Sequence, residues 1–439
     1  MIVVRLLKLL NEFLENDMTS NNNLNVEKNK EEVSKNVPEL RFQGFIDAWE
    51  QRKLDKLASF SKGSGYSKGD LMEEGSPIIL YGRLYTKYKT VINEIDTFVS
   101  PKNNSVISEG NEVIVPASGE TSNDISRASV VEKQGVILGG DLNIVKPNKE
   151  LNSIFLALTI SNGSQQKELS KLAQGNSVVH LYNSELKKVN LFFPNLAEQE
   201  KIGSFFANVD NLITLHQRKL DKLKQLKQGY LQQLFPENGE KVPKVRFANF
   251  EHEWEQCKLG KIVKWSKGNN LAKSVLNENK IGDSVIHYAD LYKFSPVVAD
   301  VIHWSESGQG TIIPNNSLLF PMSDVTPVGL ARTSTITKTG IKAGGDTLIG
   351  TIDEGLIAEF ISYQINANSN KILPLVTGTT VRHISSSSLS TLDVMIPTKL
   401  EQRKISDCLN NLEYLITLHQ AKLDNMKSIK QSLLQKMFI

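Results

Sequence analysis

Two segments of the chain share a hydrophobic pattern that predicts long amphipathic helices. Apolar positions recur at alternating steps of four and three residues from Ile202, and a second series starts at Ile405. This period is typical of coiled coils, and no proline interrupts either series. The expected seam positions are Ile202, Phe206, Val209, Ile213, His216, Leu220 and Leu223 in the first segment, and Ile405, Leu409, Leu412, Ile416, His419, Leu423 and Met426 in the second.

The two predicted helices are copies of one another. The stretch LITLHQRKLDKL begins at Leu212 and LITLHQAKLDNM begins at Leu415, and segments 198–236 and 401–439 agree at 20 of 39 positions. An apolar stripe needs a partner, and the chain contains a second stripe of the same kind. We therefore expect an antiparallel coiled coil about a pseudo-twofold axis, built from helices roughly 57 Å long.

Each stripe also contains polar positions, His216 and Lys227 in one copy and His419 and Lys430 in the other. Either these side chains reach past the edge of the seam into solvent, or they set the register of the helix pair. Apolar residues flank the stripes at Phe205, Leu212, Leu226, Cys408, Leu415 and Ile429. Because these flanks widen the apolar face, they predict a further contact, either with another helix or with the variable segments.

A variable segment precedes each helix, and both segments open with the same motif. VPELRFQGFIDAWE begins at Val37, and VPKVRFANFEHEWE begins at Val242. Short β-rich runs bounded by Gly, Pro, Asn and Ser follow, with few helical stretches, which predicts mixed α/β (α+β) domains. The expected organisation is a disordered leader at 1–36, a first domain at 37–195, a long helix at 196–236, a linker at 237–241, a second domain at 242–397 and a second long helix at 398–439.

Composition narrows the class of protein without identifying it. The net charge of +3 permits nucleic-acid binding through local patches but does not require it. The two cysteines, Cys257 and Cys408, stand far apart and outside any metal-binding spacing, which fits a reducing cytoplasm. No run of 18 apolar residues is present, so we expect no membrane partner.

Two variable domains, each opening with VPxxRFxxFxxxWE and each followed by PxxxEQxKI and a heptad helix, resemble the specificity subunit of type I restriction–modification enzymes, the HsdS family. The resemblance covers about residues 37–439. It implies that each domain reads one half of a split double-stranded DNA target and that the coiled coil fixes the spacer. It also implies two methyltransferase subunits and ATP-driven restriction subunits as partners. S-adenosylmethionine, ATP and Mg would belong to those partners, and this chain would be non-catalytic, with no cofactor or metal.

Several loops at equivalent places in the two copies are candidates for DNA contact, because they combine small, polar and basic residues. The candidate residues are Lys62, Ser64, Tyr66, Lys68, Arg83, Ser118, Thr121, Arg127, Asn269, Asn270, Asp290, Ser323, Arg332 and Arg382. Arg83 and Asp290 align across the repeat, and an arginine suits guanine whereas an aspartate suits cytosine N4. Ordinary surface turns remain the alternative for these loops, and His180 and His383 are expected to be structural.

Motifs for catalysis are missing from the sequence. It holds no GxxxxGK[ST] loop, no NPPF/Y-type methyltransferase motif and no Pro-Asp dipeptide of a nuclease. A stand-alone nuclease or methyltransferase is therefore disfavoured. The remaining alternatives are a coiled-coil adaptor whose domains bind protein and a silent copy that only donates recognition domains by recombination.

Overall fold

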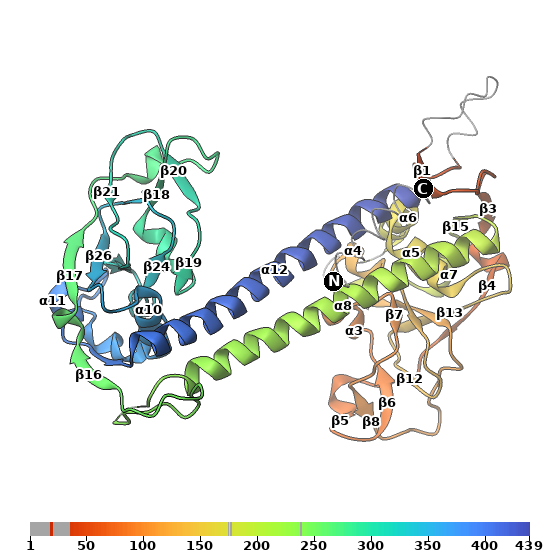
Figure 1. The fold of residues 1–439 in the computed structure, drawn as a ribbon. Coiled ribbons are helices and arrows are strands. Elements are labelled where there is room, and N and C mark those ends of the chain that lie inside the picture. Colours follow the sequence, from red (N-terminus) through yellow and green to blue (C-terminus); the bar gives the residue numbers. More distant parts are fainter. Residues whose placement is uncertain (1–17, 21–35, 174, 176–177, 238) are drawn as a thin grey trace. The chain divides into compact units, whose positions relative to one another are not determined.

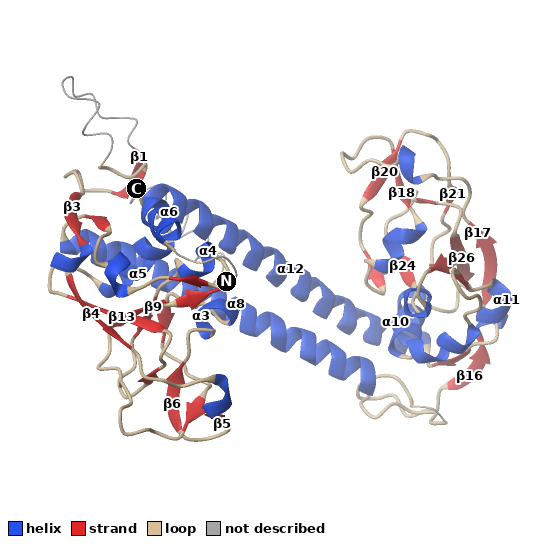
Figure 2. Ribbon diagram, turned by 180° about the vertical axis from the view of Figure 1, so that it is seen from behind, coloured by secondary structure: helices blue, strands red, loops and turns tan. Residues whose placement is uncertain are grey.

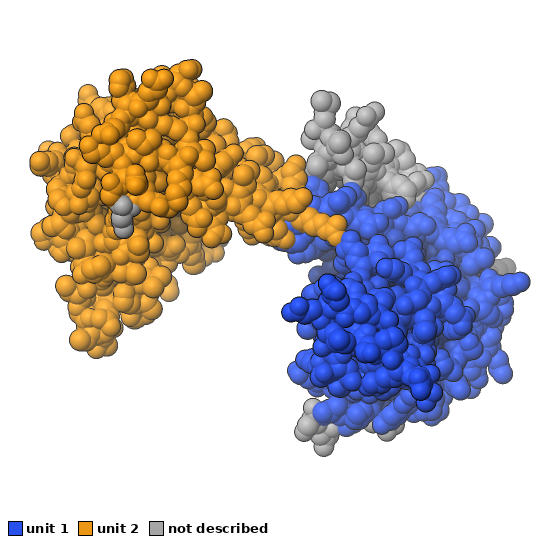
Figure 3. Space-filling view, turned by 90° about the horizontal axis from the view of Figure 1, so that it is seen from below, with its two compact units in different colours: residues 1–217, 421–439 blue, residues 218–420 orange. Residues whose placement is uncertain are grey.

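The computed structural model describes residues 18–20, 36–173, 175, 178–237 and 239–439. It divides into two compact units, and Figure 3 colours them separately. Unit 1 contains residues 1–217 and 421–439, and unit 2 contains residues 218–420. The long helices α8 (Leu196–Gln233) and α12 (Lys399–Met437) each contribute to both units. Each unit therefore combines one globular domain with a stretch of both helices.

The domain of unit 1 is built on two antiparallel or mixed sheets. The five-stranded sheet has the order β4 (Ala58–Lys62), β13 (Leu142–Pro147), β9 (Glu112–Pro116), β11 (Ser129–Val131) and β7 (Val91–Ile92). The four-stranded sheet has the order β12 (Ile137–Leu138), β6 (Ser76–Ile79), β8 (Phe98–Val99) and β5 (Leu71–Met72). The helices are α3 (Arg83–Thr86), α4 (Ser122–Ile125), α5 (Ser153–Ser161), α6 (Gly163–Leu172) and α7 (Asn183–Leu186).

The domain of unit 2 repeats this plan. Its five-stranded sheet has the order β17 (Val263–Lys267), β26 (Thr347–Ile352), β22 (Ser317–Pro321), β24 (Ser334–Ile336) and β19 (Val297–Val298). Its four-stranded sheet has the order β20 (His303–Ser305), β18 (Asp283–Ile286), β25 (Lys342–Ala343) and β21 (Thr311–Ile312). The α-helices of this domain are α9 (Pro327–Leu330), α10 (Ala358–Ala367) and α11 (Ser386–Leu389).

The central strand of each domain is buried on both faces, which explains its unbroken apolar sequence. In β9, Val113 and Val115 join the core beneath α5, whereas Ile114 points into the opposite core, which lies against the smaller sheet. Helix α5 lies against β9 and β11 (Figure 2). In β22, Leu318 and Phe320 likewise belong to the core beneath α10, whereas Leu319 belongs to the core on the opposite face. Successive side chains of a strand alternate between faces, so both faces need apolar residues here.

Two short strand pairs complete each domain and carry the repeated motifs. The Trp49 motif leads into β3 (Glu50–Lys53), which pairs with β15 (Asn190–Phe193) just before α8. In unit 2, β16 (Glu255–Lys258) pairs in the same way with β28 (Asp393–Ile396). Of the leader predicted at 1–36, Met18–Ser20 forms β1, which pairs with β2 (Leu40–Phe42), and Asn36 O accepts a hydrogen bond from Trp49 N. Residues 1–17 and 21–35 lie outside the described residues.

The repeated Glu-Gln dipeptide at the start of each long helix joins the helix to its domain. Glu198 accepts two hydrogen bonds of 2.7 Å from Arg41. The neighbouring Gln199 accepts a hydrogen bond from Asn152 N, just before α5. In unit 2, Arg246 and Glu401 form the equivalent pair, and Gln402 accepts from Ile357 N before α10. The arginine of the opening motif and the Glu-Gln dipeptide therefore attach the N-terminal turn of each long helix to its domain.

Within each unit the two helices pack together and end against the globular domain (Figure 1). In unit 1 the ring of Phe438, at the end of the second helix copy, lies 6.4 Å from Trp49 and 5.8 Å from Phe155. In unit 2, Phe235 from the first copy lies against Trp254 and Phe360, at 6.5 and 5.5 Å. Each domain thus holds the C-terminal end of the helix that follows the other domain.

The polar seam positions Lys227 and Lys430 are paired across the helices. Lys227 binds Glu413 in unit 2, and Lys430 binds Asp210 in unit 1 at 2.5 Å. These two ion pairs occupy equivalent positions of the repeat, which favours a role in register over simple exposure to solvent. The flanking residues Phe205 and Ile429 pack against the core of the first domain, so part of the widened apolar face is covered there.

Candidate nucleic-acid interface

Two of the loops that the sequence singled out meet in one short strand pair in each domain. In unit 1, β10 (Ser118–Gly119) pairs with β14 (Val179–His180), and Ser118 stands opposite His180. In unit 2, β23 (Ser323–Asp324) pairs with β27 (Arg382–His383), and Ser323 stands opposite His383. The segments 118–127 and 178–180, and their counterparts 323–332 and 381–383, therefore form one surface in each domain.

The glycine-rich loops after β4 and β17 lie against the Gly-Gly-Asp turns. Ser64 forms a β-bridge with Gly139, and a Cβ atom on Gly63 would lie 1.8 Å from Gly139 O. In unit 2, a Cβ atom on Gly268 would lie 1.9 Å from Gly344 O. Only glycine permits this approach of two backbones, so steric need accounts for these glycines without any ligand.

Tyr85 and Tyr292 support the strand pairs β10–β14 and β23–β27 through hydrogen bonds to backbone carbonyls. The Tyr85 hydroxyl donates to Ser118 O, and the Tyr292 hydroxyl donates to Ser323 O at 2.5 Å. Burial raises the pKa of both phenols above the ordinary value of 10.0, so both remain donors at neutral pH. The Gly-Gly-Asp turns join the same surface, because Asp141 O accepts from Ala117 N and Asp346 O accepts from Met322 N.

The candidate residues differ in how far solvent reaches them. Those with exposed side chains are Lys62, Lys68, Thr121, Asn269 and Asn270. Those that are half-buried are Ser64, Tyr66, Arg83, Arg127, Ser323, Arg332 and Arg382. Ser118 and Asp290 are buried. The strand pairs and the turns joined to them thus form an equivalent surface in each domain, but only part of the candidates could meet a large partner without rearrangement.

Arg83 and Asp290, the pair aligned across the repeat, are both engaged inside their own domains. Arg83 forms an ion pair with Asp96 and donates to Glu94 O at 2.6 Å. Asp290 is 3% exposed; it accepts from His287 N at 2.9 Å and lies 2.9 Å from His303 Nδ1. Base reading by this pair therefore finds no support in the geometry, because both groups already have internal partners.

Lys102, a residue that the sequence did not single out, holds Tyr66 and the 62–70 loop in place. Its backbone N–H donates to the Tyr66 hydroxyl at 2.7 Å, and its ammonium lies over the Tyr66 ring. The same ammonium binds Asp70 at 2.8 Å and lowers the pKa of that carboxyl to about 2. Tyr66 and Ser64 are thus supports of the loop, whereas Lys62 and Lys68 are its exposed cations.

The three arginines of the surface are tethered by local acceptors. Arg127 lies 3.3 Å from the Asp124 carboxylate, Arg332 donates to Tyr292 O, and Arg382 donates to Gly378 O. A guanidinium has five N–H donors, so one such bond orients the group without exhausting it. This arrangement suits contacts with phosphate oxygens or base edges.

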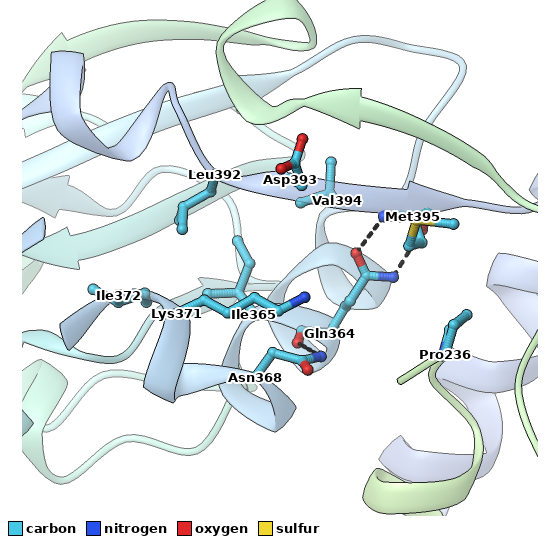
Figure 4. A pocket seen from close by; sticks show the side chains of 10 residues that line it. All are labelled: Pro236, Gln364, Ile365, Asn368, Lys371, Ile372, Leu392, Asp393, Val394 and Met395. Atoms are coloured by element: carbon cyan, nitrogen blue, oxygen red, sulfur yellow. Dashed lines mark hydrogen bonds between the residues drawn. The ribbon is translucent and has the colours of Figure 1, made fainter. Parts of the chain in front are cut away.

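A pocket in unit 2 lies outside this surface and carries no recognisable chemistry. Gln364 spans it from α10 to β28, where the amide bonds both Met395 N and Met395 O at 2.8 and 2.7 Å (Figure 4). Lys371 and Asp393 also line it, but Asp393 is paired with Lys258 at 2.8 Å. These side chains complete the packing of α10 on β28.

Neither a metal centre nor a membrane span is found in the part of the chain that the structure describes. No three His, Cys, Asp or Glu side chains of residues 18–20, 36–173, 175, 178–237 and 239–439 come close enough to hold a metal ion. Over the same residues, no helix combines the length and apolar character needed to cross a membrane.

Comparison with known proteins agrees with the repeated architecture. The family model described as "Type I restriction modification DNA specificity domain" matches residues 46–225 and again 251–428. The MjaVIII specificity subunit of a type I restriction enzyme from Methanocaldococcus jannaschii is 20% identical over 426 residues, covering 92% of this chain and 95% of that protein.

A solved structure has the same fold. The type I restriction–modification S subunit from M. genitalium superposes with a TM-score of 0.62 at 15% identity, over 92% of this chain and 99% of that chain. Together with the two matches to the family model, which span most of the chain, this likeness confirms the resemblance that the repeated motifs indicated. The chain belongs to the family of DNA specificity subunits of type I restriction–modification systems and is a non-catalytic member of such a complex.

Proposed function

We propose that each globular domain reads one half of a split sequence in double-stranded DNA. The observation that carries this proposal is one framework built twice with different outward side chains. Tyr85 and Tyr292 support equivalent strand pairs, yet the exposed positions on the following turns differ between the copies. A shared framework fixes the orientation of a reading element, whereas its variable positions can select different bases.

We further propose that the paired helices α8 and α12 dock two methyltransferase subunits and set the spacer between the half-sites. A helix of 38 residues is about 57 Å long, more than the 34–36 Å that separates sites one turn apart on duplex DNA. The ion pairs Lys227–Glu413 and Lys430–Asp210 support a fixed register. Restriction subunits would join through the methyltransferases, in the cytoplasm. S-adenosylmethionine, ATP and Mg would be bound by those partner subunits.

The test is to co-express the chain with its methyltransferase subunit and to determine the methylated adenines across the host genome. The expected result is a split motif with an adenine methylated in each half, absent without this chain. Exchange of residues 60–195 for those of another specificity subunit should change one half of the motif only. A stable complex without methylation would indicate a defective or donor copy, and the lack of any complex would overturn the proposed function.

Single substitutions refine that test. Lys62→Ala and Lys267→Ala remove exposed cations at equivalent places, and each should weaken DNA binding for all sequences and lower the slope of log Kd against log[salt] by about 1. Lys53→Ala, an exposed lysine on β3 outside these loops, is the matched control and should leave that slope unchanged. A slope that responds equally to all three would contradict the assignment of the surface.

A further inference from the structure

The turns that follow β10 and β23 have the same shape but are held by a carboxylate from different positions. In unit 1, Thr121 caps α4, accepts from Asp124 N at 3.1 Å and donates to the Asp124 carboxylate at 2.6 Å. In unit 2, Thr326 caps α9 and accepts from Gly329 N at 3.2 Å, and it donates to the Asp324 carboxylate at 3.3 Å. The equivalent threonines, Thr121 and Thr326, therefore each donate a hydrogen bond to a carboxylate.

Glycine and aspartate exchange places between the two turns. Gly119 and Asp124 in the first copy correspond to Asp324 and Gly329 in the second. The exchange is sterically coupled, because a Cβ atom on Gly329 would lie 1.3 Å from an Asp324 carboxylate oxygen. Each turn is also anchored by a fully buried apolar residue, Ile125 or Leu330. Two different solutions thus preserve one backbone shape.

The outward positions of this preserved turn are where the two domains differ. The exposed Glu120 in unit 1 corresponds to Val325 in unit 2, and Val328, three residues further along, is exposed as well. Val325 and Val328 are 73% and 72% exposed. The Asp324 carboxylate accepts hydrogen bonds from Val325 N at 2.5 Å and Thr326 N at 3.3 Å, so it holds the start of the turn that carries the two valines.

Cationic residues belong to the same surface as Val325 and Val328. Arg382 stands opposite Asp324 in the β23–β27 pair. The exposed Lys267 lies 4.0 Å from Asp346, which accepts from Ser323 Oγ at 3.1 Å. Arg332 is the last residue of the segment 323–332, which contains Val325 and Val328. Exposed apolar side chains on a surface that also carries cations are complementary to the major groove, where phosphates flank the 5-methyl group of thymine.

We propose that Val325 and Val328 are specificity-determining residues that contact thymine 5-methyl groups in the second half-site. This inference rests on the proposed function and adds the chemical class of base that domain 2 selects. The equivalent turn of domain 1 presents a carboxylate at Glu120, which suits the amino group of cytosine instead, so the two domains use one scaffold for different bases. At least one thymine of the half-site read by domain 2 must then contribute to binding through its 5-methyl group.

The experiment uses the complex of this chain with its methyltransferase subunits and duplexes that carry the mapped target sequence. Each thymine of the second half-site is replaced in turn by deoxyuridine, which lacks only the 5-methyl group. For a contacted thymine, the replacement should weaken binding about fourfold, since burial of one methyl group is worth about that factor. The double variant V325A/V328A should bind thymine and uracil duplexes equally.

Two matched variants keep the result specific to the valine turn. Glu120→Ala alters the equivalent exposed position of domain 1, and Ile312→Ala removes an exposed apolar side chain from β21 in unit 2. Both should retain the full preference for thymine over uracil in the second half-site, whereas Glu120→Ala should weaken recognition of the first half-site only. Thermal unfolding of V325A/V328A should match that of the unaltered chain, because both valines are mostly exposed.

Failure of the inference and failure of the proposed function give different results. Uracil duplexes that all bind as tightly as the thymine duplex overturn the inference while the proposed function stands. The inference is likewise overturned if V325A/V328A keeps the preference for thymine, or if it loses the methyltransferase subunit instead of the preference. Absence of chain-dependent methylation anywhere overturns both.

Discussion

In unit 1, Arg41 donates two hydrogen bonds of 2.7 Å to the two carboxylate oxygens of Glu198, and the side chains are 4% and 0% exposed. One residue belongs to the motif that opens the domain and the other to the first turn of α8. This buried ion pair fixes the direction in which the long helix leaves its domain. Its counterpart, Arg246 with Glu401, has the same two-point geometry in unit 2.

Removal of one partner should be much more harmful than removal of both. Glu198→Gln leaves the Arg41 charge buried without its counter-ion, and we expect a loss of about 3–5 kcal/mol in the free energy of unfolding of unit 1. The double variant Arg41→Met/Glu198→Leu should recover most of that loss, because no buried charge remains. Urea unfolding followed by circular dichroism measures both, and equal losses would contradict the explanation.

Phe438 should stabilise the first domain although it belongs to the helix that follows the second. Its ring is buried against Trp49 and Phe155, so Phe438→Ala should cost about 3–5 kcal/mol in unit 1. Hydrogen exchange read by mass spectrometry should show faster opening in peptides of residues 37–195 and little change in residues 242–397. Phe235→Ala is the matched variant, and it should speed opening in residues 242–397 with little change in residues 37–195. Uniform loss of protection in both domains would refute this exchange of helix ends.

Asp210 couples the helix pair to the first domain. It binds Lys430 of α12 at 2.5 Å and accepts a hydrogen bond of 2.9 Å from Thr90, which precedes β7. A double-mutant cycle with Asp210→Ala and Lys430→Ala should give a coupling energy of about 1–2 kcal/mol. The exposed pair Lys436–Glu39 in the same unit is the control, and its coupling should stay below about 1 kcal/mol. Equal couplings would mean that the seam pair has no special role.

His287 should make unit 2 less stable in mild acid. Burial lowers the pKa of its imidazole below 6.5, and Nδ1 already accepts a hydrogen bond from Ala289 N at 3.3 Å. Asp290 and Asp346 oppose the shift, whereas His303 and Lys273 add to it. Because the unfolded chain binds the proton first, the free energy of unfolding falls as pH drops below 6.5 and is unaffected above it.

The check is a comparison of unfolding free energies between pH 5 and 8 for the unaltered chain and for His287→Gln. The variant should have a shallower slope below about pH 6.5 and the same slope above it, since only the titrating group has been removed. His252→Gln is a suitable control, because that side chain is exposed. Parallel curves for all three proteins would exclude His287 as the source of the pH dependence.

The sequence alone determined the repeat, the two heptad helices and the mixed α/β character of the domains. Each of these is a local or periodic property, and the apolar positions from Ile202 and from Ile405 are visible without coordinates. The lysines in the seam were visible too, and the repeated acids at Asp210 and Glu413 could have indicated their partners. Periodicity states which face of a helix is buried, because the period of the backbone is fixed.

Only the tertiary structure decided which groups remain available for binding. Arg83 and Asp290 looked like a matched pair of base readers, but each is held by partners that sequence spacing does not reveal. The sequence does not mark Val325 and Val328 as binding residues, because apolar residues in a loop normally indicate packing. Their exposure follows from the bond between Asp324 and the turn, together with burial of Leu330. Such contacts depend on where distant strands place the backbone, and no local pattern encodes that placement.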